Sequence, residues 1–304
     1  MLSFHVKLKP YLHKLTTYIP RAIVYCLLLW SFWVYTWTIC IKTVSNFYGI
    51  ILIFFASIGF IISFWCYTAT TFTFPGSPRG NDGYVCIESR NYSTFISVKQ
   101  NGSARFCNKC EILKPDRTHH CSICNYCILK MDHHCPWLSN CIGFANYKQF
   151  LLFLIYISIY SIYLFISSLI ILYKFIILLN IPSKNVIPVN WMLLLVISGV
   201  FSIVLGIFTI WHIFLVSRNL TTIEALKQTC YIGNLNNDDS RSNSKIRNAF
   251  DLGWKKNWIQ VMGSNKFLWF FPIVNNLGTG ESFPVNNDIA KKLYEYFHHS
   301  KNII

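Results

Sequence analysis

The fold of the central region is decided by residues 107–141, which read CNKCEILKPDRTHHCSICNYCILKMDHHCPWLSNC. One metal-ligand pattern occurs twice in this stretch, with the copies fourteen residues apart. The two copies are Cys107-x2-Cys110-x9-His120-x6-Cys127 and Cys121-x2-Cys124-x9-His134-x6-Cys141. Three thiolates and one imidazole form the donor set of a closed structural zinc site. The repeat predicts two interleaved zinc sites and argues against the alternative of one site with spare cysteines.

The two predicted sites leave Cys135, His133 and His119 without a metal. A third site cannot follow, because Leu138 stands where the second cysteine of the next pair is needed. Cys135 comes shortly after Asp132 and His133. A carboxylate that orients an imidazole, which in turn takes a thiol proton, activates a cysteine nucleophile. The sequence therefore predicts that Cys135 is a nucleophile, against the alternative that it is a redundant thiol.

The composition is that of a membrane protein. Of 304 residues, 53% are hydrophobic and only 13% are charged. Four apolar stretches reach the roughly 20 residues that a helix needs to cross a bilayer. We expect an α-helical integral membrane protein with a small zinc-stapled domain between the second and third spans. The expected spans are 18–41, 47–71, 150–179 and 191–216.

Positive charge is concentrated in three segments. Lys and Arg number 27 against 12 Asp and Glu, and most lie in 1–17, 72–149 and 217–304. The positive-inside bias predicts that these three segments, and so both termini, face the cytosol. Attraction to anionic lipid explains most of this charge, and docking of an anionic substrate such as coenzyme A is a second reading. Nucleic-acid binding is not expected, because no nucleic-acid-binding motif accompanies the charge.

The cysteine-rich segment 107–150 resembles that of the DHHC protein S-acyltransferases, or palmitoyltransferases, whose naming motif matches Asp132-His133-His134-Cys135. Residues 221–224 (TTIE) are similar to the family's TTxE motif, and 257–263 (NWIQVMG) to its C-terminal aromatic motif. One departure is Phe74-Pro75-Gly76, where the family commonly has Asp-Pro-Gly. It puts a local turn in doubt and leaves the catalytic residues in place.

The resemblance implies a two-step reaction, in which Cys135 takes a long-chain acyl group, such as palmitoyl, from acyl-coenzyme A and passes it to a protein cysteine. It implies that His133 is the general base and that Asp132 orients it. It also places Thr221, Thr222 and Glu224 near the active site, Asn257 in tail packing against the domain, and Trp137 near the mouth of an acyl cavity.

The same resemblance implies two structural zinc ions, acyl-coenzyme A as co-substrate, and membrane-associated substrate proteins with cytosolic cysteines. The expected location is an endomembrane (Golgi or endoplasmic reticulum) or the plasma membrane. Two other functions fit the residues less well. A catalytically silent zinc-binding membrane adaptor would leave the Asp132–His133 pair without a purpose. A channel or transporter is disfavoured, because only Arg21 and Lys174 are charged within the apolar stretches.

The predicted topology can be tested by glycosylation. Asn91, Asn101 and Asn219 each begin an Asn-x-Ser/Thr sequence, and all lie in segments expected to face the cytosol. We expect that the protein expressed in eukaryotic cells does not shift in mobility after N-glycosidase treatment. A glycan on any of the three would contradict the predicted topology.

Overall fold

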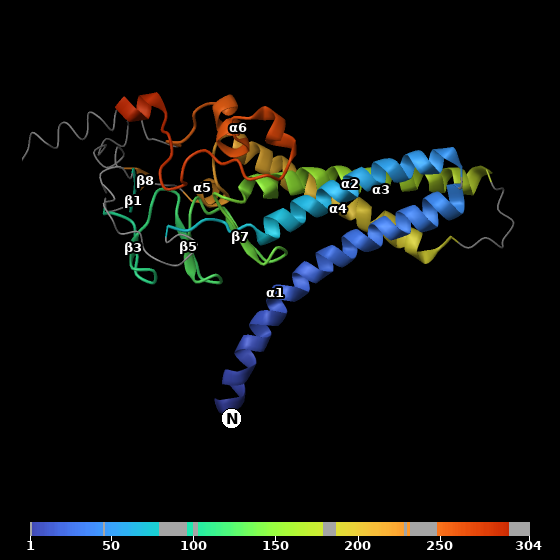
Figure 1. The fold of residues 1–304 in the computed structure, drawn as a ribbon, viewed down its shortest axis with the longest axis horizontal. Coiled ribbons are helices and arrows are strands. Elements are labelled where there is room, and N and C mark those ends of the chain that lie inside the picture. Colours follow the sequence, from blue (N-terminus) through green and yellow to red (C-terminus); the bar gives the residue numbers. More distant parts are fainter. Residues whose placement is uncertain are drawn as a thin grey trace, which may run out of the picture. The chain divides into compact units, whose positions relative to one another are not determined.

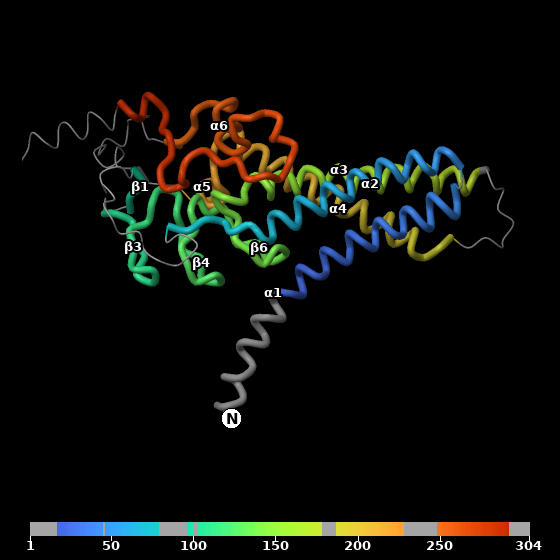
Figure 2. Tube along the Cα trace, viewed as in Figure 1, coloured from blue at the N-terminus to red at the C-terminus, as the bar shows by residue number. Residues whose placement is uncertain are grey.

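The computed structural model describes residues 2–44, 46–78, 96–99, 103–178, 187–227, 230–231 and 248–291. Figure 2 follows the chain through these ranges. Asn91, Asn101 and the end of the third expected span, residue 179, lie outside the described residues. The chain forms two compact units. The membrane unit comprises Met1–Thr71, Pro136–Ser139 and Gln149–His212, and the cysteine-rich unit comprises Phe72–Cys135, Asn140–Lys148 and Ile213–Ile304.

Four long helices supply the apolar stretches (Figure 1). They are α1 (Leu2–Trp33) with its π-helical continuation η1 (Val34–Val44), α2 (Phe47–Phe72), α3 (Tyr147–Leu178) and α4 (Val189–Ser217). Within the described residues, the apolar segments Thr17–Val44, Phe47–Phe72, Tyr147–Ile177 and Val189–Ser217 are long enough to cross a membrane. At 1.5 Å per residue, the shortest of them exceeds the roughly 30 Å of a hydrocarbon core. This confirms the expected class, a multi-pass helical protein.

Large apolar side chains cover the outside of the membrane unit. Ile61 on α2 is 60% exposed and Ile210 on α4 is 68% exposed. Such contiguous apolar exposure is unfavourable in water, but a bilayer accepts it. The surface of these helices therefore fits lipid.

Polar side chains and small residues join the helices inside the membrane unit. Tyr35 donates a hydrogen bond to Ser167 at 2.8 Å, and Thr209 Oγ1 on α4 donates to the carbonyl of Leu154 on α3 at 3.0 Å. Gly59 on α2 touches Tyr160, since a Cβ there would lie 2.9 Å from the ring. Hydrogen bonds and close approach at small residues hold helices together where the hydrophobic effect between helix and lipid is weak.

Three successive β-hairpins make up the centre of the chain. They are β2–β3 (Phe106–Cys107, Ile112–Leu113), β4–β5 (His119–Cys121, Tyr126–Ile128) and β6–β7 (His133–Cys135, Asn140–Ile142). The same register recurs every fourteen residues: Phe106 pairs with Leu113, His120 with Cys127, and His134 with Cys141. The ligand pattern is written twice, but the hairpin is built three times.

The turn after α2 is built on Pro75 and Gly76, with Phe74 before them. Gly76 has a φ of 95°, which favours glycine. The carbonyl of Gly76 accepts from Leu129 N at 3.0 Å, and that of Pro75 accepts from Ala145 N at 3.0 Å. Phe74 stacks on the Tyr126 ring with centroids 5.7 Å apart. The Pro–Gly backbone therefore carries the turn, and Phe74 adds an aromatic contact within the cysteine-rich unit.

The segments after α4 complete the cysteine-rich unit. They are α5 (Thr222–Leu226), β8 (Cys230–Tyr231), α6 (Trp254–Met262) and the 3-10 turn η4 (Lys266–Phe270). Strand β8 pairs with β1 (Ser97–Val98), so residues on either side of the three hairpins meet in one small sheet. Buried Lys148 donates to the carbonyls of Leu268 at 2.8 Å and Ile273 at 3.0 Å, which fixes the tail next to η4.

Candidate functional site

The structure brings together the two predicted sets of metal ligands. The first set is Cys107, Cys110, His120 and Cys127, and the second is Cys121, Cys124, His134 and Cys141. Within each set the donor atoms lie within 4.8 Å of one another. The first hairpin supplies a Cys-x2-Cys turn to the first set. The second hairpin supplies a facing His–Cys pair to the first set and a Cys-x2-Cys turn to the second. The third hairpin supplies a facing His–Cys pair to the second set. The second hairpin therefore serves both sets, which explains why they interleave along the chain.

The donor distances fit zinc. A tetrahedral ion with sulfur at about 2.3 Å and nitrogen at about 2.0 Å holds those two donors about 3.6 Å apart. His120 Nδ1 lies 3.3 Å from Cys110 Sγ, 3.6 Å from Cys107 Sγ and 4.0 Å from Cys127 Sγ. His134 Nδ1 lies 3.4 to 3.7 Å from the three thiols of its set. Both sets therefore have the chemistry and the spacing of closed structural zinc sites.

Strand geometry separates Cys135 from these ligands. Residues 133–135 form β6, and successive side chains of a strand point to opposite faces. His134 faces the second ligand set, so His133 and Cys135 share the other face. In the hairpin before, Cys121 stands at the position equivalent to Cys135 and is a ligand of the second set. Among the described residues, Cys135 belongs to neither set.

Asp132 is the most tightly held group beside Cys135. Its side chain is fully buried, and its Oδ2 lies 2.6 Å from His133 Nδ1. Thr222 donates to both carboxylate oxygens, from its backbone N at 2.8 Å and from its hydroxyl at 2.7 Å. A carboxylate with these partners fixes the imidazole ring through Nδ1, so proton uptake falls to Nε2.

The pKa of His133 follows from this setting. Burial by itself would lower it, but the hydrogen bond to Asp132 and the interaction with the Cys135 side chain favour the imidazolium. Together they raise the pKa of His133 to about 9. The ring therefore binds a proton more tightly than an ordinary histidine, which favours an imidazolium beside a cysteine thiolate.

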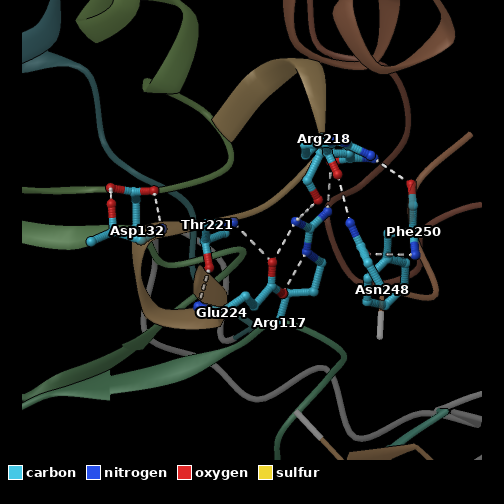
Figure 3. A network of polar contacts seen from close by, with 9 residues as sticks. Arg117, Asp132, Arg218, Thr221, Glu224, Asn248 and Phe250 are labelled. Carbon is cyan, nitrogen blue, oxygen red and sulfur yellow. Dashed lines mark hydrogen bonds and ion pairs between the residues drawn. The ribbon is translucent and has the colours of Figure 1, made fainter. Parts of the chain in front are cut away.

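A buried ion pair between Arg117 and Glu224 holds the start of α5 in place (Figure 3). Arg117 donates to both oxygens of Glu224, at 2.8 and 2.7 Å, and neither side chain is more than 5% exposed. Arg117 also donates to the Asn219 side chain at 2.9 Å and to its carbonyl at 2.8 Å. Glu224 in turn accepts from Thr221 N at 2.9 Å in a capping box at the start of α5. This network fixes the first residues of α5, and so the two donors of Thr222.

Opposing charges set the ionisation of the network. Burial would raise the pKa of Glu224, but the charge and hydrogen bonds of Arg117 hold that pKa below its usual range. For Lys130, burial and the repulsion by Arg117 lower the pKa to about 7. Removing one partner of a buried, hydrogen-bonded ion pair typically costs about 3–5 kcal/mol of stability.

The remaining predicted residues lie at separate places. Trp137 is 58% exposed, and its carbonyl accepts from Tyr67 at 2.8 Å. Asn257 is buried, and its side chain bonds Ser217, Asp251 and Leu252. His119 is half-buried, and burial together with nearby Arg105 lowers its pKa to about 4. The position of His119 thus gives it no evident role in the metal sites.

Sequence reasoning missed Arg117 and Asn219. Arg117 and Glu224 are 107 residues apart along the chain, so no local pattern connects them. Both lie beside residues that the sequence did single out, which is the nearest signal it offers.

Comparison with known proteins places the chain among its relatives. A family description, DHHC palmitoyltransferase, matches residues 100–229. Palmitoyltransferase PFA3 of Gibberella zeae is 33% identical over 87% of this chain and 62% of its own length. Palmitoyltransferase pfa3 of Neurospora crassa is 41% identical over 78% of this chain and 38% of its own length. Palmitoyltransferase ZDHHC15 of Rattus norvegicus is 33% identical over 90% of this chain and 84% of its own length.

The chain belongs to the DHHC palmitoyltransferase family. It spans less than two thirds of the length of the two fungal relatives and most of the length of the rat protein. In this DHHC family member, the two Cys₃His groups support structural zinc.

The ligand assignment can be tested by metal analysis. Replacing His134 with Ala removes the only imidazole of the second set, so we expect the zinc content to fall to about one per chain and the protein to lose solubility in detergent. Inductively coupled plasma analysis measures the metal. Cys26→Ala, at an exposed cysteine outside both sets, is the matched control and should retain two zincs. Two zincs in the His134 variant would contradict the assignment.

The role of Thr222 can be tested by removing its hydroxyl alone. Thr222→Val keeps the backbone N–H donor but loses the bond to Asp132 Oδ2, and a hydrogen bond to a charged group is worth about 1.5–3 kcal/mol. We expect acylation of the protein by acyl-coenzyme A to slow about tenfold or more, with zinc content unchanged. Thr222→Ser restores a hydroxyl and should recover most of the rate. Equal rates for valine and wild type would show that the hydroxyl does not contribute.

Proposed function

We propose that this chain is a protein S-acyltransferase that moves a long-chain acyl group, such as palmitoyl, from acyl-coenzyme A to cysteine thiols of membrane-associated proteins. Membership of the DHHC family and similarity to proteins named palmitoyltransferases support the activity. The position of Cys135 carries the proposal. It is the one cysteine of the described 107–141 stretch outside both metal sets, and it shares a strand face with a histidine held by a buried carboxylate.

The first step forms an acyl-enzyme. His133 takes the proton of the Cys135 thiol, while Asp132 keeps the ring oriented and stabilises the imidazolium. The thiolate attacks the thioester carbonyl of acyl-coenzyme A, and the bond between that carbon and the coenzyme sulfur breaks. The coenzyme leaves as a thiolate and takes up the proton from His133. The product is a thioester on Cys135, with charge and atoms conserved.

In the second step Cys135 is the leaving group. A substrate cysteine gives its proton to His133 and attacks the Cys135 thioester. The acyl group moves to the substrate sulfur, and the departing Cys135 thiolate recovers its proton from His133. Since both steps exchange one thioester for another, the transfer needs no external energy source.

Zinc, bound by the two ligand sets, would supply structure and no chemistry, because three thiolates and one imidazole complete each tetrahedron and leave no position for substrate. The ligands in turn support the catalytic strand. His134 stands between His133 and Cys135 in β6, so fixing its side chain restrains the backbone on both sides.

The chain connection supports chemistry at a lipid boundary. Cys135 is followed directly by Pro136–Ser139, which belong to the membrane unit, and consecutive Cα atoms are only about 3.8 Å apart. A fatty chain could stay in apolar surroundings near the thiol, and each methylene kept from water contributes about 0.8 kcal/mol. Trp137, next in this turn, is our candidate for the mouth of such an acyl site.

The proposal includes a membrane topology and a set of supporting residues. We propose the spans 18–41, 47–71, 150–179 and 191–216, with 1–17, 72–149 and 217–304 in the cytosol of an endomembrane or plasma membrane. Thr221, Thr222 and Glu224 would support the active site through the network around Asp132, and Asn257 would support it through tail packing.

Labelling tests the nucleophile. Cys135→Ser should bind two zincs and elute as a folded species, yet it should acquire no hydroxylamine-sensitive label from a clickable palmitoyl-coenzyme A analogue, because a serine ester resists hydroxylamine. Cys26→Ser is the control and should label like wild type. Full labelling of the Cys135 variant, with no transfer to any protein by the wild type, would instead favour the silent zinc-binding adaptor.

A further inference from the structure

The third hairpin lacks the element that fixes the turns of the first two. In the first two hairpins the turn carries a pair of metal ligands, Cys107 with Cys110 and Cys121 with Cys124. The equivalent pair in the third is Cys135 with Leu138, so no metal can bridge its ends. The turn still has the same backbone character, because Ser139 has a positive φ of 44°, as Asn125 does at the matching position with 61°. Some other contact has to hold this conformation.

Residues of α1 and α2 hold the third turn within the membrane unit. Arg21 donates from Nε to the carbonyl of Leu138 at 2.8 Å and from Nη2 to the carbonyl of Ser139 at 2.7 Å. Tyr67 donates from its hydroxyl to the carbonyl of Trp137 at 2.8 Å. Three successive carbonyls of the turn are therefore bonded by two side chains. The Leu138 side chain is only 1% exposed, so burial replaces the second thiol of the earlier turns.

Arginine at the entry of an apolar span usually needs no special explanation, because its side chain can reach the lipid head groups. Here the guanidinium is half-buried, and two of its nitrogens are directed at consecutive backbone carbonyls. A guanidinium presents its donors in a rigid plane, so this pairing fixes the direction of the turn as well as its distance. A lysine could supply the charge but not two donors in fixed geometry.

We infer that Arg21, assisted by Tyr67, is a positioning residue for the nucleophile: it holds the turn that begins directly after Cys135, in the role that the metal has in the first two hairpins. This inference rests on the proposed acyl transfer. Arg21 contacts the turn and not the reacting atoms. It limits the motion of the backbone that carries the thiol, and a displacement of about 1 Å of a reacting group can slow a reaction about a hundredfold.

The test compares variants of the full chain in detergent or nanodiscs. Arg21→Lys keeps the charge and loses the fork, Arg21→Met loses both, and Tyr67→Phe loses the single hydroxyl contact. Lys42→Gln changes a cation in the last turn of η1, in the same apolar segment, and is the matched control. For each variant, zinc content is measured together with the amplitude and rate constant of the burst of coenzyme A release on mixing with palmitoyl-coenzyme A.

The two burst parameters separate positioning from folding. We expect Arg21→Met to lower the burst rate constant at saturating palmitoyl-coenzyme A about tenfold to a hundredfold, with burst amplitude and two zincs per chain retained. Arg21→Lys should recover only a small part of the rate, Tyr67→Phe should show a smaller loss, and Lys42→Gln should match wild type.

Three outcomes would overturn the inference. One is an unchanged rate constant in Arg21→Met; another is full recovery by Arg21→Lys, which would leave only a charge at the lipid surface. The third is a loss confined to amplitude, which would mean that fewer molecules fold. Absence of any burst in the wild type is a different result, because it would contradict the proposed acyl transfer itself.

Discussion

The alternation of side chains along one three-residue strand governs the chemistry of this protein. Because β6 is extended, His134 points to the second ligand set while His133 and Cys135 point the other way. A single backbone segment thus carries a structural ligand between the proposed base and the proposed nucleophile. Any metal that fixes His134 also limits the motion of its two neighbours. The metal ligand His134 is therefore linked to His133 and Cys135 through one peptide bond each.

Repetition of the hairpin explains how a cysteine outside both ligand sets arises in a structural motif. Cys107, Cys121 and Cys135 occupy equivalent positions in three copies. The first two find a second thiol three residues on, whereas the third finds Leu138. A buried leucine and the hydrogen bonds of Arg21 and Tyr67 take the place of that second thiol. Lys148 and Ile155 stand where the histidine and last cysteine of a third set would be, so among the described residues Cys135 has no metal set to join.

The proposed chemistry also requires that the carboxylate of Asp132 is held in one position by protein groups, because water does not reach it. Asp132 is fully buried, so its charge depends on the donors around it. Thr222 supplies two of them, and the Arg117–Glu224 ion pair keeps α5 in the place where Thr222 can do so. Such a buried network is sensitive to the loss of any single member, since each leaves an uncompensated polar group. Asp132, the partner of His133, is thus held by residues that precede α3 and by residues that follow α4.

The sequence by itself determined the features that depend on residue type at short range. Ligand spacing identified both metal sets and the unused cysteine, and the length of the apolar stretches predicted the four helices. Only the tertiary structure decided which distant groups meet: Arg117 with Glu224, Thr222 with Asp132, and Arg21 with the turn after Cys135. The third hairpin could not be predicted from the sequence either. Glu111, Asn125 and Ser139 share a backbone conformation with positive φ, but they are three different residue types. Ligand sets and apolar spans depend on residues that are close together in the sequence, so the sequence predicts them. Contacts between residues about a hundred positions apart depend on how the whole chain packs.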